Sequence, residues 1–567
     1  MNEARQRWLL VLLTAFTFLF LLGSRALNEP DEGRYSEIAR EMIVTGDWVV
    51  PHLWYLPHLD KPPLTYWLVA VSMKWFGQNE WALRLPLALA GLSGVWAAFL
   101  LGSLLGGRRA GFWSAVILQS SLLYFAMARM LTTDMFLTQF TAWAVHFFWR
   151  SWLAATSGIG NRKSGIVLWN LAGWAAIALG FLAKGPIALA VPLLALAAVA
   201  VFRLKIFKAK KLLWGGLAGG FALFLVLTLP WFLAVFRRVP QSAHYMILGQ
   251  VAGHLLGTTI KNRKGGPFYF FAILAVGLLP WTFLLGWLWR RAHWHGLDEK
   301  SKGAWLLLNV WVFFPFALFS FSEAKLPAYI LPIFPALAVM LAWRFFSGKP
   351  AAASAPKWAW QVCLAGAVLL PTVFPWLLKY AFRDALPARM TWQTPAAVGT
   401  AVVALWLARN RRPPTVAAFA AGLALLGFFA TVAEIPPFET SLRDNQTLKP
   451  LGQTLRERVH PGDAVVCWGK FPEGLPFYAG AAMSATNRPY LGDMDLTQVP
   501  FEFPGNRQRL GDRLLPDENA LVRLLSKKNR VWIVGFGDTV ERFEQAHQAT
   551  PLDLVTNVGQ WKLFVSR

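Results

Sequence analysis

The sequence predicts a mostly helical membrane protein that crosses the bilayer many times and ends in a small α/β domain. Of the 567 residues, 56% are hydrophobic and only 15% are charged, whereas about a quarter of the residues in a soluble domain carry a charge. Apolar runs of bilayer-spanning length, roughly 17–25 residues, recur up to residue 432. The net charge of +25 does not indicate a nucleic-acid partner, because the basic residues stand between the apolar runs and not on one soluble face.

Thirteen apolar runs are predicted to span the membrane, with the N-terminus in the cytoplasm. This orientation places the basic short turns on the cytoplasmic side, as the positive-inside rule requires. The exception is the external loop 237–265, whose basic residues either hold an anion or are a tolerated departure from the rule. At 184–186 a single kinked helix would also fit. The predicted spans are 8–27, 81–105, 110–128, 133–154, 166–183, 185–202, 212–236, 267–289, 304–321, 326–346, 358–379, 394–408 and 414–432.

The segment after the last predicted span has the pattern of a separate α/β domain. Short buried-strand patterns alternate there with helical patterns, and an odd number of spans places this segment on the external face. We therefore expect a membrane domain at 1–433 and an external domain at 434–567. The only cysteines, Cys363 and Cys467, are expected to be free thiols. Strands are expected at 464–468, 531–535 and 561–565, and helices at 518–526 and 538–547.

The first external segment, 28–80, opens with a dense cluster of charges at Asn28–Tyr35. Asp31 fits the N-cap of a helix, and Glu29 and Glu32 fit the charged residues of a helix start. The residues that follow alternate with helical period, which predicts an amphipathic helix lying on the outer membrane interface. Its expected solvated face consists of Glu37, Arg40 and Glu41.

Other polar sites share the outer face with this cluster. Asp134 lies where the chain re-enters the membrane, Lys184 lies at the next external turn, and the segments Asp60–Pro63 and Ser322–Tyr329 are external as well. An ionisable group at membrane depth is costly and is by default a functional candidate. Cations can hold a lipid phosphate, and a carboxylate can act as a base or stabilise a developing oxocarbenium ion. Because nucleotide sugars are absent outside the cell, a sugar donor used here would be lipid-linked.

Four motifs in chain order resemble those of the lipid A aminoarabinose transferases, the ArnT family. That family is part of the polyprenyl-phosphate-mannose protein mannosyltransferase superfamily and has the GT-C fold. The motifs are Glu29–Tyr35, Asp60–Pro63, Thr133-Asp134 and Lys325–Pro332. The resemblance implies a GT-C-like protein of about thirteen transmembrane helices in the bacterial inner membrane, with a periplasmic α/β domain at its C-terminus.

The resemblance also implies a role for each matching residue. Asp31 is the expected principal catalytic carboxylate and Asp134 its supporting partner. Asp60, which stands where the family usually has Glu, is a secondary site residue. The expected ligands of the substrate and of the lipid-carrier phosphate are Arg34, Tyr35, Lys61, Tyr329 and, as a further candidate, Lys325. For Tyr329 the alternative is an aromatic residue of the membrane interface.

One departure from the family concerns metal binding. Members can carry a run of the His-Glu-His kind in the external loop before the eighth span. Here the corresponding stretch, Leu248–His254, offers a single His and no carboxylate, which is a poor metal site. We therefore expect no metal and no other cofactor.

The expected function is the transfer of a sugar, aminoarabinose or another, from a polyprenyl-phosphate carrier. The acceptor would be lipid A or another component of the cell envelope at the periplasmic face. A lipid A phosphate is already anionic and needs little help from a base, whereas a sugar hydroxyl would depend on Asp31. Two alternatives stay open: protein O-mannosyl transfer, and transport of a lipid or solute. A transport path would need polar groups near the bilayer midplane, and these are not evident in the sequence.

Overall fold

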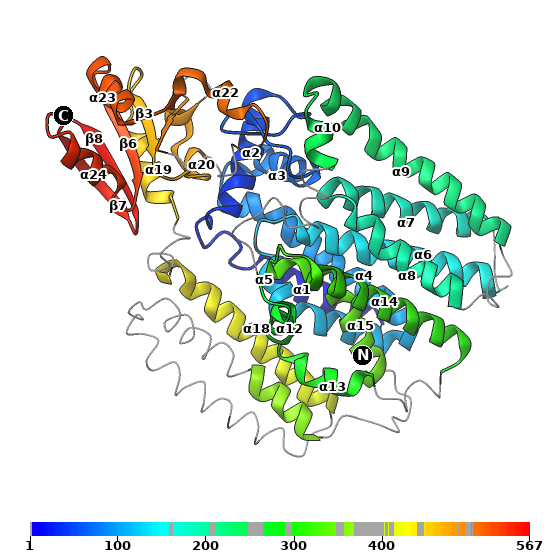
Figure 1. The fold of residues 1–567 in the computed structure, drawn as a ribbon. Coiled ribbons are helices and arrows are strands. Elements are labelled where there is room, and N and C mark those ends of the chain that lie inside the picture. The colour runs from blue at the N-terminus through cyan, green and yellow to red at the C-terminus, as the bar shows by residue number, and fades with distance from the viewer. Residues whose placement is uncertain are drawn as a thin grey trace.

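The computed structural model describes residues 3–157, 163–202, 210–247, 265–289, 297–346, 357–367, 402, 406, 413–438, 447–484, 488–493, 501 and 503–567. Within these residues the chain forms a large helical body and a smaller domain built around a β-sheet (Figure 1). The helices α2 (Asp31–Thr45) and α3 (Leu64–Phe76), which follow the first apolar segment, lie between these two parts (Figure 1). The predicted fold class, a mostly helical membrane protein with a C-terminal sheet domain, is confirmed.

The helices of the body coincide with every predicted span up to residue 346. The two spans predicted at 81–105 and 110–128 run together in α4, which breaks at Gly107, where φ is 79°. The open boundary at 184–186 separates two helices. The body contains α1 (Glu3–Leu19), α4 (Glu80–Gln119), α5 (Leu122–Met127), α6 (Asp134–Ser157), α7 (Lys163–Lys184), α8 (Ile187–Phe202), α9 (Lys210–Arg238), α12 (Tyr269–Gly277), η3 (Trp281–Leu284), α13 (Leu285–Leu288), α14 (Glu299–Phe321), η5 (Pro327–Ile333), α15 (Phe334–Phe346) and α18 (Pro413–Phe438).

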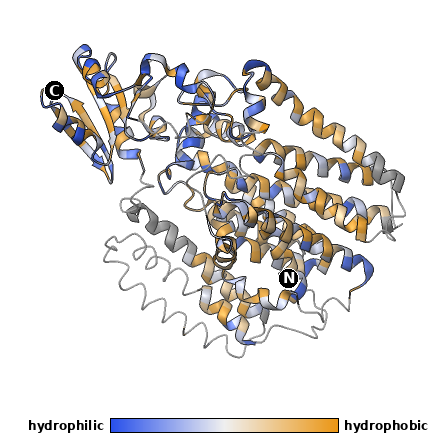
Figure 2. Cartoon of the chain, in the orientation of Figure 1, coloured by the Kyte–Doolittle hydropathy of each residue, from blue (hydrophilic) through white to orange (hydrophobic). Residues whose placement is uncertain are grey.

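The described residues contain fewer helices that could cross a membrane than the thirteen spans that the sequence predicts. In the described part of the chain, five helices are long and apolar enough to cross a membrane, or six if the pair of helices bent by 107° between 269 and 288 is one span. Apolar residues dominate the helices of the body (Figure 2). The predicted spans 358–379 and 394–408 fall mostly outside the described residues, so the count of thirteen stays a prediction.

The first external segment folds into two helices with a hairpin between them. The helix α2 spans Asp31–Thr45 and ends at Gly46, whose left-handed backbone (φ 71°) closes the last turn. The strands β1 (His52–Leu53) and β2 (Leu56–Pro57) pair antiparallel. The helix α3 (Leu64–Phe76) begins after Pro63. Next to the membrane helices, α10 (Ser242–His244) follows α9.

The C-terminal domain is a six-stranded mixed sheet with the order β5-β4-β3-β6-β8-β7. The strands β3, β4, β5 and β6 are parallel, and β8 joins β6 and β7 antiparallel. The predicted strands and helices are confirmed. The elements are α19 (Lys449–Arg458), β3 (Ala464–Trp468), α20 (Leu475–Ala479), η6 (Gly480–Met483), β4 (Tyr490–Gly492), α22 (Asn506–Leu510), η7 (Gly511–Arg513), β5 (Leu514–Leu515), α23 (Glu518–Lys527), β6 (Val531–Phe536), α24 (Thr539–Ala546), β7 (Leu552–Val558) and β8 (Trp561–Ser566).

Both cysteines are free, as predicted, and both are buried. Cys467 lies in the central strand β3, where all five residues are buried. Burial raises the pKa of its thiol well above the usual value, so the thiol stays protonated and is inert at neutral pH.

Candidate active site

Asp31 is the first residue of α2 and not its N-cap, so the sequence prediction was wrong by one position. Pro30 occupies the N-cap, and no side chain accepts a capping hydrogen bond there. The first turn closes through backbone bonds instead, from the Glu32 amide to the Asn28 carbonyl and from the Arg34 amide to the Pro30 carbonyl. The Asp31 carboxylate is therefore not used for capping, and 41% of its side chain is exposed.

Glu32 lies in the first turn of α2, as predicted, and its carboxylate has a further role. Glu32 is buried and accepts hydrogen bonds from the guanidinium groups of Arg25 and Arg84, at 2.7–3.0 Å. Burial alone would raise the pKa of the Glu32 carboxyl, but the two arginine charges hold it well below its usual range. The backbone amide of Leu131 donates to the same carboxylate at 3.0 Å. Glu32 thus ties the start of α2 to α4 and to the segment that precedes α6.

Glu29 also has a structural role, because it connects α2 to the C-terminal domain. Its carboxylate is buried and accepts a hydrogen bond from the Gly474 amide at 3.1 Å. The backbones approach so closely that a side chain on Gly474 would lie 2.2 Å from Glu29 and 2.7 Å from the Cα of Gly33. Glycine at 33 and 474 is therefore required for this contact.

The face of α2 that was predicted to be solvated is buried. Glu37, Arg40 and Glu41 are at most 4% exposed. Glu37 pairs with Arg40 at 2.7 Å, and Glu41 accepts a hydrogen bond from the Tyr55 amide at 2.8 Å. The helix is therefore enclosed between the hairpin, α3 and the C-terminal domain. The sequence prediction was wrong here because the charged residues have partners inside the fold.

Arg34 connects the helix start to a carboxylate that the sequence analysis missed. Its guanidinium donates to both oxygens of Glu473, at 2.5 and 2.9 Å, and lies 3.7 Å from the Asp31 carboxylate. The side chains of Arg34 and Glu473 are both less than 10% exposed. Glu473 is more than 400 residues away in the chain, and no motif marks it, so only the fold reveals the pair.

The Tyr35 hydroxyl lies within electrostatic reach of four of the predicted site residues. Burial raises the pKa of Tyr35, and the nearby Asp31 carboxylate raises it further. Arg34 acts in the opposite direction, while Asp134 and Asp60 also raise the pKa. The Tyr35 ring stacks on Tyr66, with 5.6 Å between the ring centroids. Three carboxylates from three separate motifs therefore act electrostatically on one buried phenol.

Asp60 lies in a buried group with His58, Lys61 and Tyr245. The Tyr245 hydroxyl donates to the Asp60 carboxylate at 2.5 Å, and His58 Nε2 lies 3.8 Å from its other oxygen. Burial raises the pKa of Asp60, but His58, Lys61 and the Tyr245 hydrogen bond together lower it below the usual value. The Lys61 ammonium donates to the Asp60 carbonyl at 3.1 Å. The second motif therefore presents one ionised carboxylate and one cation at the same edge of the site.

Asp134, Lys184 and Tyr329 form a chain of contacts between three helices. Asp134 begins α6 and forms an ion pair with Lys184, the last residue of α7. The Lys184 ammonium also lies over the Tyr329 ring, 4.8 Å from its centroid. The structure thus brings together Asp134 and Tyr329, as predicted, and adds Lys184, which the sequence analysis singled out without assigning a role.

Lys325 is held by a helix end. Its ammonium donates to the carbonyls of Ser320 and Ser322 at 2.7 and 2.8 Å, close to the C-terminus of α14. A cation at this end of a helix also interacts favourably with the helix dipole. Its predicted role in phosphate binding stays a prediction, and the contacts give it a capping role.

The structure gives no support to a metal centre in the described residues, where no group of three or more potential metal ligands occurs. The stretch Leu248–His254, from which the sequence argument came, lies outside the described residues. In the external basic loop, Arg238 pairs with Asp47 at 3.0 Å, and the remaining basic residues at 261–264 are likewise outside the described part.

His58 makes the stability of the external segment depend on pH. Burial lowers its pKa from 6.5 to about 4, so between these values the unfolded chain binds a proton that the folded chain does not. Neutral His58 therefore contributes up to about 3 kcal/mol to the free energy of unfolding. This contribution is fully present above pH 6.5 and is lost as the pH falls toward 4. We expect the unfolding temperature of the wild type to fall more between pH 7 and pH 5 than that of His58→Asn. An equal loss in the two proteins would contradict this assignment.

Comparison with known proteins agrees with this arrangement. The family described as dolichyl-phosphate-mannose-protein mannosyltransferase matches residues 60–235. The undecaprenyl phosphate-alpha-4-amino-4-deoxy-L-arabinose arabinosyl transferase of Erwinia tasmaniensis is 34% identical over 347 residues, which cover 60% of this chain and 60% of that protein. The protein of the same name from Aeromonas hydrophila is 32% identical over 59% of each chain. Over about 60% of its length the chain is similar in sequence to these aminoarabinose transferases.

The solved structures show that the likeness in fold extends over the whole chain. The crystal structure of ArnT from Cupriavidus metallidurans bound to undecaprenyl phosphate has a TM-score of 0.79, with 23% identity, and covers 100% of this chain and 98% of that one. Its apo form has a TM-score of 0.78. The predicted family resemblance and the GT-C fold are therefore confirmed. The match in sequence to the curated aminoarabinose transferases spans about 60% of their length.

Proposed function

We propose that the protein is an inner-membrane glycosyltransferase that moves a sugar from a polyprenyl-phosphate carrier to lipid A or another envelope acceptor. The observation that supports this most directly is that Asp31, Asp60 and Asp134, together with Arg34, all act electrostatically on the buried Tyr35 hydroxyl. The arrangement supplies both kinds of group that such a transfer needs: carboxylates for the sugar and acceptor, and cations for the phosphate. The names of the relatives favour undecaprenyl phosphate as the carrier and aminoarabinose as the sugar.

In the proposed reaction, an acceptor oxygen attacks the anomeric carbon of the sugar on the side opposite the phosphate. The bond between that carbon and the phosphate oxygen breaks, and the polyprenyl phosphate leaves with the electron pair. Asp31, the most exposed of the three carboxylates, accepts the proton of a hydroxyl acceptor or stabilises the positive charge that develops on the sugar. Asp134 supports it from α6. A single displacement of this kind inverts the anomeric centre.

The cations have separate places in this scheme. Lys61 lies beside Asp60 and Lys184 beside Asp134, and Tyr329 lies under the Lys184 ammonium. We assign the binding of the departing phosphate to Lys61, Arg34 and Tyr329, and we add Lys184 to these residues. Arg34 is already neutralised by Glu473, so its part is to fix the helix start as much as to attract an anion.

The proposal includes the placement of the chain in the membrane. Residues 1–433 form the membrane-embedded transferase domain, with the N-terminus in the cytoplasm, and residues 434–567 form a periplasmic domain. The contacts of Glu29 and Arg34 with residues 473 and 474 support this, because they require the cluster and the C-terminal domain to be on the same side.

The test is an assay of the purified full-length protein with undecaprenyl-phosphate-linked aminoarabinose and lipid A. We expect the mass of lipid A to increase by one aminoarabinose unit and the donor to be consumed in equal amount. A parallel reaction with a polyprenyl-phosphate mannose donor and an acceptor protein covers the activity named for the matching family. Donor that remains intact in both reactions would contradict the proposed function.

A further inference from the structure

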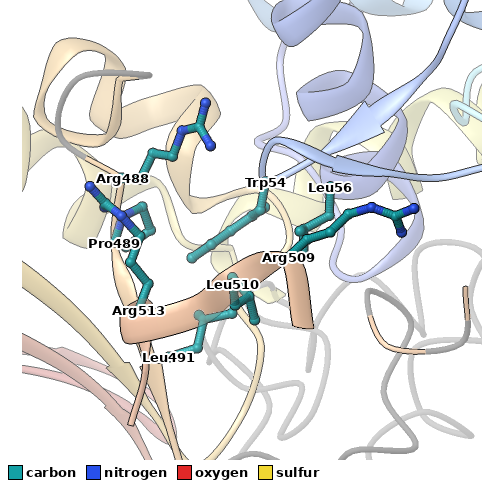
Figure 3. A pocket seen from close by; sticks show the side chains of 8 residues that line it. All are labelled: Trp54, Leu56, Arg488, Pro489, Leu491, Arg509, Leu510 and Arg513. Atoms are coloured by element: carbon teal, nitrogen blue, oxygen red, sulfur yellow. The ribbon is translucent and has the colours of Figure 1, made fainter. Parts of the chain in front are cut away.

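Three arginines of the C-terminal domain surround a cleft that faces the β1–β2 hairpin. Arg488 precedes β4, Arg509 lies in α22 and Arg513 lies in η7. The side chains of Arg488 and Arg513 lie on one side of Trp54, and that of Arg509 lies on the other side and points away from them (Figure 3). The remaining lining is apolar: Leu56, Pro489, Leu491 and Leu510. None of these residues belongs to the four motifs or to the carboxylate cluster.

The described residues provide no carboxylate partner for these three guanidinium groups. Arg488 lies over the Tyr55 ring at 4.7 Å, and Arg513 lies over the Tyr490 ring at 5.6 Å. Arg509 donates to the Pro504 carbonyl and the Asn506 side-chain oxygen, both uncharged. Nη1 of Arg513 is buried and has no hydrogen-bond partner among the described residues. The cleft therefore holds uncompensated positive charge and one unused buried donor.

The pKa shifts of Arg513 and of the neighbouring His52 indicate the same excess of positive charge. Burial lowers the pKa of Arg513; Tyr490 acts against this effect, and the nearby Arg488 charge lowers the pKa further. Burial also lowers the pKa of His52, at the base of the hairpin; Asp47 acts to raise it, whereas Arg488 and Arg509 lower it further. Single exposed arginines are ordinarily solvated and need no partner. Arg488 and Arg513, which repel each other beside an apolar lining, are better explained by an anion that binds next to both.

Trp54 connects this cleft to the carboxylate cluster. Its indole N–H donates to the Glu473 carbonyl at 3.4 Å, and its ring packs against Phe471 with 4.4 Å between centroids. Glu473 in turn holds Arg34 next to Asp31. An anion in the cleft would therefore lie on the external side of the site, one residue beyond the pair that fixes the catalytic helix.

We propose that this cleft binds a phosphate group on the headgroup of the acceptor glycolipid and thereby holds the acceptor while another of its oxygens reaches Asp31. The inference rests on the proposed function for the identity of the acceptor. Guanidinium groups bind phosphate through two parallel hydrogen bonds. The lipid-carrier phosphate, by contrast, is held at Lys61 and Tyr329.

The test compares two double variants of the full-length protein. Arg488→Gln/Arg513→Gln removes two charges from the cleft, whereas Arg507→Gln/Arg523→Gln removes two exposed charges from α22 and α23 of the same domain. With lipid A that carries its phosphates, we expect the first variant to raise the acceptor KM roughly 10–100-fold, with donor KM and kcat unchanged. The control variant should resemble the wild type. Lipid A stripped of phosphate should bind the wild type and both variants with the same Kd.

A binding measurement without donor separates this inference from the proposed function. Phosphorylated lipid A should bind the wild type and the control variant more tightly than Arg488→Gln/Arg513→Gln, even if no sugar is ever transferred. Equal binding by all three proteins would overturn the inference. So would loss of inorganic phosphate binding in the cleft variant without any change for lipid A, because the cleft would then serve a free anion.

Discussion

Replacing Asp31 by Asn should lower kcat by roughly 10²–10⁴-fold, the range for loss of a positioned general base, while the donor KM changes little. This corresponds to about 3–5 kcal/mol of transition-state stabilisation. The substitution keeps the size of the side chain and removes only its charge. Because Asp31 makes no capping hydrogen bond, α2 should start at the same residue in the variant. The measurement is the initial rate of sugar transfer at several donor and acceptor concentrations.

The matched control is Asp47→Asn, in the same external segment. Asp47 accepts hydrogen bonds from the Val49 and Val50 amides, which an Asn side-chain oxygen can also accept. It pairs with Arg238 and has no contact with the carboxylate cluster. This variant should retain the wild-type rate. Full activity in Asp31→Asn would remove Asp31 from the mechanism. A loss that depends on whether the acceptor is a hydroxyl or a phosphate would identify it as a base.

The fold was predictable where hydrophobic pattern alone decides the structure. The apolar runs locate helices up to α15, and the buried strands at 464–468 and 531–535 match β3 and β6 closely. The number of spans was less accessible, because length and composition do not distinguish a straight helix from a bent pair such as 269–288. The turn predicted between residues 105 and 110, by contrast, coincides with the break of α4 at Gly107.

The site was predictable only in part, for a related physical reason. A short motif reveals which residue types occur together, and so it identified Asp31, Asp60 and Asp134, which the fold gathers around Tyr35. Charge alone cannot reveal whether a residue is solvated or paired inside the protein. Glu37 and Arg40 were placed on a solvated face, whereas in the fold they pair with each other and Arg40 also donates to the Tyr55 hydroxyl in the hairpin. Glu473 was missed for the same reason, since its partner Arg34 is distant in the sequence.

Glu473→Gln should be the most destabilising single change in the external part of the protein. The change would remove the nearer of the two carboxylates beside the buried Arg34 guanidinium. The other one, Asp31, is 3.7 Å away and partly exposed, so it compensates the arginine charge less well. Removing one partner of a buried ion pair typically lowers the free energy of unfolding by about 3–5 kcal/mol. The loss arises mainly from the charge left behind and not from the attraction itself. Thermal unfolding of the full-length protein in detergent measures it directly.

Two further variants identify the origin of the effect. Asp538→Asn disrupts an exposed pair with Arg542 in the same domain, and we expect no measurable change, because exposed pairs are screened by water. Arg34→Met/Glu473→Met removes both buried charges and should be more stable than Glu473→Gln alone, although it loses the placement of Asp31. If Glu473→Gln unfolds at the same temperature as Asp538→Asn, the pair does not hold α2 to the C-terminal domain. Arg34 would then act on the proposed catalytic carboxylate of Asp31 through its charge, and not by anchoring α2.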